Sequence, residues 1–305
     1  MKTKPSGLTM IELVIVLIIL AALTGIAVQS LDPIADQARF ESTQRTLENI
    51  DAAFLGRDSG GAYIGFIADM GRLPENVNSD PSLALGELWT LTGTPHDIHS
   101  FSDPTLDTDD IATGVQPLLV PVVAGWRGPY VNLPPGGNNL VDSFGRPFII
   151  NSATVGQSVV SVISQGPDSS VSDDDLALPS GTWNEARFSE DTVLVSVQEI
   201  DGGDVELDVD ETLRIRLYGA RDGAPSLLGE APLETNGTGA VISIPTTRQF
   251  VLQSNDPAIP IPFGRKTLVA VVTDNSTPPV VQHQGFRQFV HGPSGNEIVV
   301  SVDPN

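Results

Sequence analysis

The feature that most constrains this chain is an apolar run from Leu13 to Val28 with a single carboxylate, Glu12, directly before it. Counted from Leu8, about 21 residues lead to the end of this run, and a helix of that length rises about 30 Å. This rise matches the hydrocarbon core of a bilayer. The sequence therefore predicts a membrane-spanning helix over residues 8–28.

The residues in front of the run distinguish it from an ordinary secretory signal. Lys2 and Lys4 favour a cytoplasmic N-terminus. A secretory signal has a shorter apolar segment followed by a small-x-small cleavage site, whereas here the natural cleavage point precedes the apolar run. A carboxylate within a span costs about 2.5 to 3.5 kcal/mol on insertion scales, so Glu12 is expected to have a function and a partner.

Gly7, Leu8, Thr9 and Glu12, followed by the apolar run, resemble the N-terminal signal of type IV prepilins and type II secretion pseudopilins. The resemblance implies that a prepilin peptidase cuts between Gly7 and Leu8 and methylates the new amine. It also implies that Glu12 pairs with the N-terminal amine of a neighbouring subunit, since a buried carboxylate and ammonium offset each other's desolvation only if they meet. Leu8 departs from the family's usual phenylalanine, and Gln29 from its frequent proline. The alternative is a plain signal anchor with Glu12 near the interface.

Apolar residues three and four apart continue from Leu31 to about Leu55 and indicate an amphipathic helix. Pro33 is expected to kink this helix or to mark the end of its membrane half. Gly60 and Gly61 should end it. The two halves together predict one helical rod over residues 8–58.

The next segment, residues 59–185, contains blocks that resemble the head of the major pseudopilin of type II secretion. These blocks are Trp126–Tyr130, Asp142–Ile150 and Ser164–Asp168. A strand is expected at Val159–Ile163, and the polar residues 93–116 are typical of a long surface loop.

The loop after this strand binds calcium in the family, and the resemblance implies the same here. Calcium takes six to eight oxygen ligands from a pliable loop. The candidate ligands are Ser164, Asp168, Asp173, Asp174 and Asp175. The family's glycine pair is absent from this loop, and a solvated acidic turn is the alternative.

Strand periodicity begins near Glu190. Val205, Leu207 and Val209 alternate with acidic residues, a pattern typical of strands that are buried on one face. About seven short strands over residues 190–305 predict an antiparallel β-sandwich. The segment Phe263–Asn275 resembles a late strand of bacterial immunoglobulin-like modules. The acidic row Asp204–Asp210 is either a solvated strand face or a second calcium site.

Composition excludes several functions. Lys and Arg total 16 against 38 Asp and Glu, which argues against nucleic acid as a partner. There is no cysteine, so thiolate nucleophiles and cysteine zinc sites are excluded. His96 and His99 are the only closely spaced histidines, and their polar context argues against a metal site. No phosphate-loop, dinucleotide or Gly-x-Ser-x-Gly motif is present, so we expect no enzyme.

The sequence thus predicts an α+β protein made of four parts: a leader (1–7), a transmembrane and rod helix (8–58), a pseudopilin-like α+β head (59–185) and an immunoglobulin-like β-sandwich (190–305). The resemblance implies a subunit of a type IV pilus or of the pseudopilus of type II protein secretion. Its expected partners are copies of itself, other pilins, prepilin peptidase, an inner-membrane assembly platform and, before assembly, membrane lipid. The precursor would be a single-pass inner-membrane protein that later enters a periplasmic or extracellular filament. The alternatives are a minor, tip-located pilin with an adhesive domain and a permanently membrane-anchored β-domain binding protein.

Overall fold

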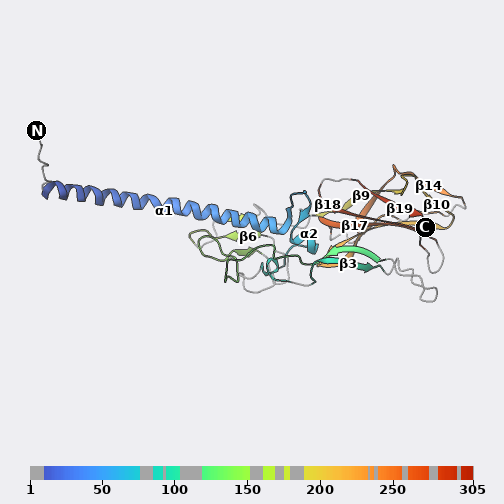
Figure 1. The fold of residues 1–305 in the computed structure, drawn as a ribbon, viewed down its shortest axis with the longest axis horizontal. Helices are drawn as coiled ribbons and strands as arrows, with labels where there is room; N and C mark the ends of the chain where they lie inside the picture. Colours follow the sequence, from blue (N-terminus) through green and yellow to red (C-terminus); the bar gives the residue numbers. More distant parts are fainter. Residues whose placement is uncertain are drawn as a thin grey trace, which may run out of the picture.

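The computed structural model describes residues 10–75, 85–91, 94–103, 119–151, 161–168, 175–178, 189–232, 234–236, 240–255, 260–274, 281–293 and 297–304. It has an extended shape, with the N-terminus at the end of a long helix and the C-terminus in a β domain at the opposite end (Figure 1). Between them lies a smaller region of short strands and loops. The candidate site lies where these parts meet.

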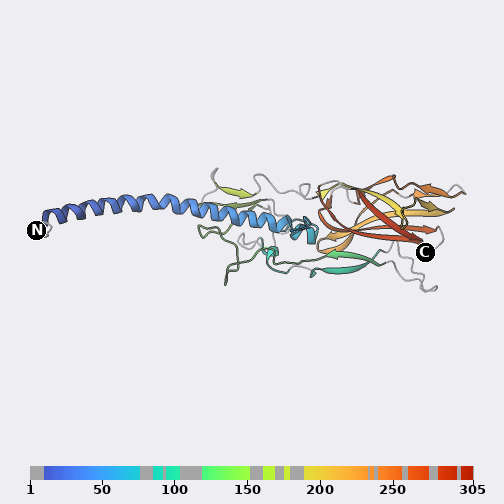
Figure 2. The same ribbon diagram turned by 45° about the horizontal axis from the view of Figure 1, so that its top comes forward.

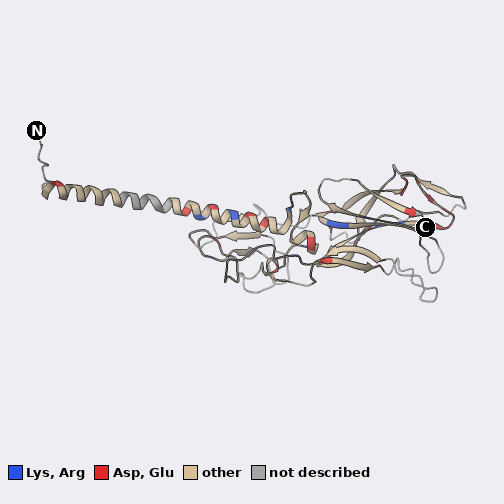
Figure 3. Ribbon diagram, viewed as in Figure 1, with Lys and Arg blue, Asp and Glu red and all other residues tan. Residues whose placement is uncertain are grey.

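The helix α1 (Met10–Leu55) contains 46 residues, is continuous through Pro33 and has two different halves. Its last turns pack on the rest of the chain through Leu47, Ile50 and Phe54, each at most 1% exposed. Its first turns project away from the remainder of the molecule (Figures 1 and 2). The large apolar side chains of these turns are exposed. After Glu12, the next charged residue of α1 is Asp32, and the others follow in the second half (Figure 3).

The small region beside the end of α1 has its own apolar core. It contains β1 (Gly56–Arg57), β2 (Tyr63–Ile64), α2 (Phe66–Met70), the 3-10 helix η2 (Gly86–Leu88), β5 (Ile149–Asn151), β6 (Ser161–Ser164) and β7 (Leu176–Leu178). Side chains of α1, α2 and η2 meet here, with Phe54, Phe66 and Leu88 fully buried. This core fixes α2 against the end of α1.

The C-terminal domain is a closed ring of seven strands. The ring runs β12 (Ala224–Glu230), β15 (Gln249–Ser254), β9 (Thr192–Glu199), β19 (Ile298–Pro304), β18 (Val281–His291), β17 (Gly264–Asp274) and β11 (Glu211–Arg221), and β11 pairs back with β12. β9 and β19 are parallel, whereas the other neighbours are antiparallel. Leu213, Ile215 and Leu217 of β11 lie in the interior core with alternate residues of the other strands.

Short strands complete the domain. β10 (Val205–Leu207) pairs with β14 (Ile242–Ile244), β8 (Ser189–Glu190) pairs with β16 (Ile261–Pro262), and β13 (Glu234–Thr235) adds to β11.

A β-hairpin from the middle of the chain covers part of the outer face of the barrel. It consists of β3 (Asp97–Ser102) and β4 (Leu119–Ala124). Val120 and Val122 pack on Tyr218, Val269 and Val271. β17 is therefore buried on both faces along most of its length. The prediction of a surface loop over residues 93–116 is wrong where β3 forms.

The observed architecture corrects the predicted fold class. The protein is predominantly β, and the domain over residues 190–305 is a barrel, not an immunoglobulin-like sandwich. The domain is a barrel because β11 pairs with β17 along one edge and with β12 along the other. These two pairings leave no open edge in the ring, and removing edges is the usual advantage of closure.

No helix among the described residues is long and apolar enough to cross a membrane. The predicted membrane span over residues 8–28 and the single-pass inner-membrane location are corrected accordingly.

Candidate functional site

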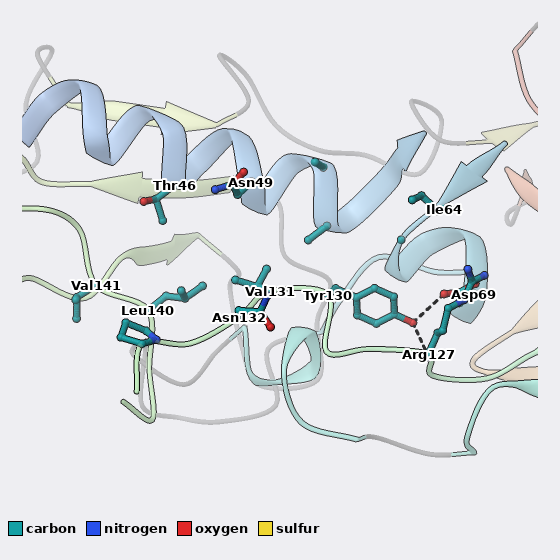
Figure 4. A pocket seen from close by; sticks show the side chains of 14 residues that line it. Thr46, Asn49, Ile64, Asp69, Arg127, Tyr130, Val131, Asn132, Leu140 and Val141 are labelled. Atoms are coloured by element: carbon teal, nitrogen blue, oxygen red, sulfur yellow. Dashed lines mark hydrogen bonds and ion pairs between the residues drawn. The ribbon is translucent and has the colours of Figure 1, made fainter. Parts of the chain in front are cut away.

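A pocket of about 660 Å³ lies between the last turns of α1 and the segment 127–141. Figure 4 shows side chains from both of these elements and from α2 around it. Its walls are largely apolar, and Asp69, Arg127 and Tyr130 lie together at one end. The lining residues are Thr46, Asn49, Ala52, Ala53, Ile64, Gly65, Asp69, Arg127, Tyr130, Val131, Asn132, Pro134, Leu140 and Val141.

The polar end of the pocket is built around Asp69, which is 3% exposed. Its Oδ1 accepts a hydrogen bond of 2.6 Å from Arg127 Nη2, and its Oδ2 accepts one of 3.1 Å from the Tyr130 hydroxyl. His96 Nε2 lies 3.8 Å from the same Oδ1. The hydroxyl of Tyr130 also accepts from the backbone N–H of Arg127 at 2.9 Å. We call Asp69, His96, Arg127 and Tyr130 the Asp69 cluster.

The position of Asp69 depends on how closely α2 approaches the barrel. Gly71 ends α2 in the left-handed conformation, with φ of 75°, and its N–H donates to Ile67 O at 2.9 Å. A Cβ at this position would lie 1.9 Å from Ala220 O of β11. Only glycine accommodates both this backbone conformation and this contact without displacement. The close contact with the barrel therefore fixes the position of α2, and with it the position of Asp69.

Burial dominates the electrostatics of the cluster. It raises the pKa of the Asp69 carboxyl, although the charges of Arg127 and His96 act in the opposite direction. Burial also lowers the pKa of His96, assisted by Arg127 and Arg265. The pKa of the Tyr130 hydroxyl is raised by burial and by the nearby Asp69. The cluster therefore contains one ion pair, between the buried Asp69 and the half-exposed Arg127, beside a neutral phenol.

Two further titratable groups lie beneath α2 at the same end of the barrel. Lys266 of β17 is 2% exposed, and its Nζ donates to Arg265 O at 3.3 Å. Because residues two apart share a face of a strand, Lys266 lies on the interior side with Leu268 and Ala270. Burial lowers its pKa to about 7. Burial, with the charge of Lys266, lowers the pKa of His291 to about 3.

Of the residues predicted to act in processing and assembly, the structure describes only Glu12. Gly7 and Leu8 lie outside the described residues. Glu12 lies in the first turn of α1 and is exposed. These roles stay predictions.

The predicted calcium loop is described only at its two ends. Asp168 is exposed and Asp175 is half-buried, whereas Asp173 and Asp174 lie outside the described residues. Ser164 Oγ donates to Asp142 Oδ2 at 2.7 Å.

The side chain of Arg146 already binds the start of this loop. Arg146 donates to the carbonyl oxygens of Gly166 and Pro167. Over the part of the chain that the structure describes, no group of three or more acidic, histidine or cysteine side chains could hold a metal ion. The described ends of the loop do not form such a group, and the calcium site stays a prediction.

Residues of the acidic row Asp204–Asp210 and of the pair His96 and His99 contact protein groups. Asp204 accepts hydrogen bonds from Ser243 Oγ and the backbone N–H of Thr246. His96 faces Asp69, whereas His99 Nε2 lies 3.2 Å from Ala124 O.

Sequence reasoning did not identify the Asp69 cluster. Asp69 stands among Phe66, Ile67 and Met70, and all of α2 is buried. A carboxylate within so apolar a stretch was the available signal, because a buried charge requires a partner. The partners Arg127 and Tyr130 fall within the block that was assigned only by resemblance.

No family model matches the chain, and searches of curated proteins and of solved structures find no match. The predicted membership in the type IV pilin and pseudopilin family has no support in these comparisons, and we correct it. The functions that depended on it are corrected with it: the pilus or pseudopilus subunit, the minor pilin, the membrane-anchored binding protein and a role in type II secretion.

Proposed function

We propose that the chain is a non-enzymatic, self-associating protein, in which the apolar first half of α1 packs against the same segment of other copies. The barrel is then displayed at the far end of the molecule. The observation that carries this proposal is the exposure of every described large apolar side chain in residues 10–23. We call this segment the apolar arm.

The apolar arm is exposed on all sides of the helix. Ile18 is 63% exposed, Leu17 57% and Leu20 54%. Successive residues of an α-helix are about 100° apart, so the unbroken series from Leu13 to Leu20 surrounds the axis. A helix that is apolar all round is normally buried. One groove on a partner would cover only one side, whereas several packed helices cover all sides.

The composition of the apolar arm suits helix-to-helix packing. It consists mainly of leucine, isoleucine and valine, whose branched side chains fill the holes between residues of a facing helix. Glu12 is the only charged residue between Met10 and Thr24. Charged pairs such as Arg39 with Asp36 begin further along α1 and are exposed. The barrel lies beyond the other end of α1, so it leaves the arm accessible (Figure 1).

Sedimentation velocity of the full chain without detergent tests the proposal. We expect concentration-dependent association, weakened at least about tenfold by Leu17→Glu because a carboxylate would be placed among apolar side chains. Ala38→Glu adds the same charge to an exposed position of α1 outside the arm and should leave association unchanged.

Two outcomes would overturn this function. One is a chain that remains monomeric at all concentrations. The other is an association that Leu17→Glu and Ala38→Glu affect equally. Monomers that float with phosphatidylcholine vesicles would instead identify lipid as the partner of the arm.

A further inference from the structure

The pocket beside the Asp69 cluster has the size and the wall chemistry of a small-molecule site. Its volume of about 660 Å³ falls within the roughly 300 to 1,000 Å³ of typical ligand pockets. Val131, Pro134 and Leu140 supply an apolar wall. The opposite end carries Arg127 and the two other labelled cluster residues, Asp69 and Tyr130 (Figure 4). A ligand that fits both ends has an apolar body and one polar terminus.

The hydrogen-bonding groups at the polar end select an acceptor. Asp69 accepts bonds at both oxygens, and Tyr130 uses its proton on Asp69. Arg127 is 39% exposed and carries five N–H donors. Within the described residues, its guanidinium bonds only to Asp69. The remaining donors of Arg127 are therefore the strongest groups that the pocket offers to a ligand.

The pocket offers one further amide donor from each of its two sides. Asn49 and Asn132 line it from α1 and from the facing segment, and both are exposed. Thr46, in contrast, already donates its hydroxyl proton to Ser42 O at 3.1 Å. A ligand terminus with two acceptor oxygens matches the guanidinium of Arg127 better than a terminus that donates protons does, and the amides supply further donors along the pocket.

The local charge also admits an anion. His96 is influenced by the two arginines Arg127 and Arg265 and by the two carboxylates Asp69 and Asp97. Cationic side chains thus stand beside the carboxylates here, although the chain as a whole carries a formal charge of −22. An entering carboxylate would meet a half-exposed guanidinium, while the nearest carboxylate, Asp69, is buried and already paired.

We propose that this pocket binds a small organic carboxylate, with its carboxylate on Arg127 and its apolar body against Val131, Pro134 and Leu140. The geometry that carries the proposal is the half-exposed guanidinium at the polar end of an apolar-walled cavity. This site does not depend on the apolar arm, because the two lie on different parts of α1.

A titration with three matched probes tests the site. The full chain is titrated with 3-phenylpropionate, 3-phenylpropionamide and 3-phenylpropylamine, and binding is followed by calorimetry and by the shift in unfolding temperature. The carboxylate should bind about tenfold more tightly than the amide, since its hydrogen bonds to Arg127 are charge-assisted. The amine should bind most weakly.

Two variants separate binding from folding. Arg127→Gln should remove the preference for the carboxylate, but it also leaves Asp69 buried without its ion pair. Ala52→Trp therefore provides the second test, because Ala52 is exposed and lines the pocket, so a large ring there fills the cavity without disturbing the core. Ala38→Trp, at an exposed position of α1 that does not line the pocket, is its control.

The outcomes decide the proposal in either direction. Loss of 3-phenylpropionate binding in Ala52→Trp with normal binding in Ala38→Trp supports it. Equal affinity for carboxylate and amide, no binding of the carboxylate at millimolar concentration, or unchanged binding in Ala52→Trp would overturn it.

Discussion

Arg127 donates a 2.6 Å hydrogen bond to the buried carboxylate of Asp69, although 58 positions separate the two residues in the chain. This ion pair ties the segment after β4 to α2, and α2 in turn rests against the barrel through Gly71. The pocket, the end of α1 and the barrel are therefore held together by a few buried contacts around one short helix.

Removing Arg127 should destabilise the protein more than its exposure alone suggests. Arg127→Gln leaves the carboxyl of Asp69 buried without its cationic partner, so we expect a loss of about 2 to 3 kcal/mol in the free energy of unfolding. Arg39→Gln breaks an exposed pair with Asp36 and should cost less than about 0.5 kcal/mol. Urea denaturation of the two variants measures both values. Equal losses would show that the Asp69 pair contributes no more than a surface pair.

Gly71 and Gly61 offer a matched test of the contact between α2 and the barrel. Both have positive φ, 75° and 81°, but a Cβ added at Gly71 would meet Ala220 O, whereas one added at Gly61 would meet nothing within 4 Å. Gly61→Ala should cost about 1 to 2 kcal/mol from backbone strain. Gly71→Ala should cost at least about 2 kcal/mol more, because helix and strand must separate. Similar unfolding midpoints for the two variants would contradict this packing.

Lys266 gives the stability of the protein a specific pH dependence. Its pKa falls from 10.5 to about 7 on folding because it is buried. Between these values the unfolded chain binds a proton that the folded chain does not, so stability rises with pH from about 7 to 10.5, by up to about 1.4 kcal/mol per unit. Below about pH 7 both states are protonated, and this contribution to the slope vanishes.

The matched variant for this test is Lys266→Met, which keeps the length of the side chain and removes the titrating group. Urea denaturation at pH 6, 8 and 10 should show a rise for the natural chain that is smaller in the variant. Parallel profiles would exclude Lys266 as the source.

Calcium should raise the unfolding temperature of the full chain if Asp168, Asp173, Asp174 and Asp175 hold the ion, because a ligand that binds only the folded state stabilises it. Magnesium should act weakly, since it requires stricter octahedral geometry. Differential scanning calorimetry with calcium, magnesium or chelator measures the shifts. Identical midpoints would leave the loop as a solvated acidic turn.

The local helices and strands could largely be predicted from the sequence, whereas the closure of the strands into a barrel could not. Gly60 and Gly61 indicated the end of the helix, and the alternation of Val205 with Leu207 lies in β10. The pairing of β11 with β12, which closes the barrel, depends on backbone hydrogen bonds that no periodicity records. The parallel pairing of Val300 with Val197 joins segments about a hundred residues apart and is equally invisible in local patterns.

The candidate site was missed for the same reason. A single aspartate in the sequence is usually a surface residue, and Asp69 acquires its meaning only when Arg127 and Tyr130 reach it. The hairpin β3–β4 is a comparable case, since the mainly polar segment Asp97–Ser102 forms a strand through pairing with Leu119–Ala124. Tertiary contact overrides local propensity in both places.

The most direct measurement of self-association uses the absence of cysteine from the chain, because any introduced cysteine is then unique. Leu17→Cys lies in the apolar arm, and Asp201→Cys lies in an exposed turn of the barrel domain. Mild oxidation of dilute protein should convert Leu17→Cys to a covalent dimer and leave Asp201→Cys monomeric on a non-reducing gel. Equal cross-linking of the two variants, or none in Leu17→Cys, would contradict the proposed packing of the arms.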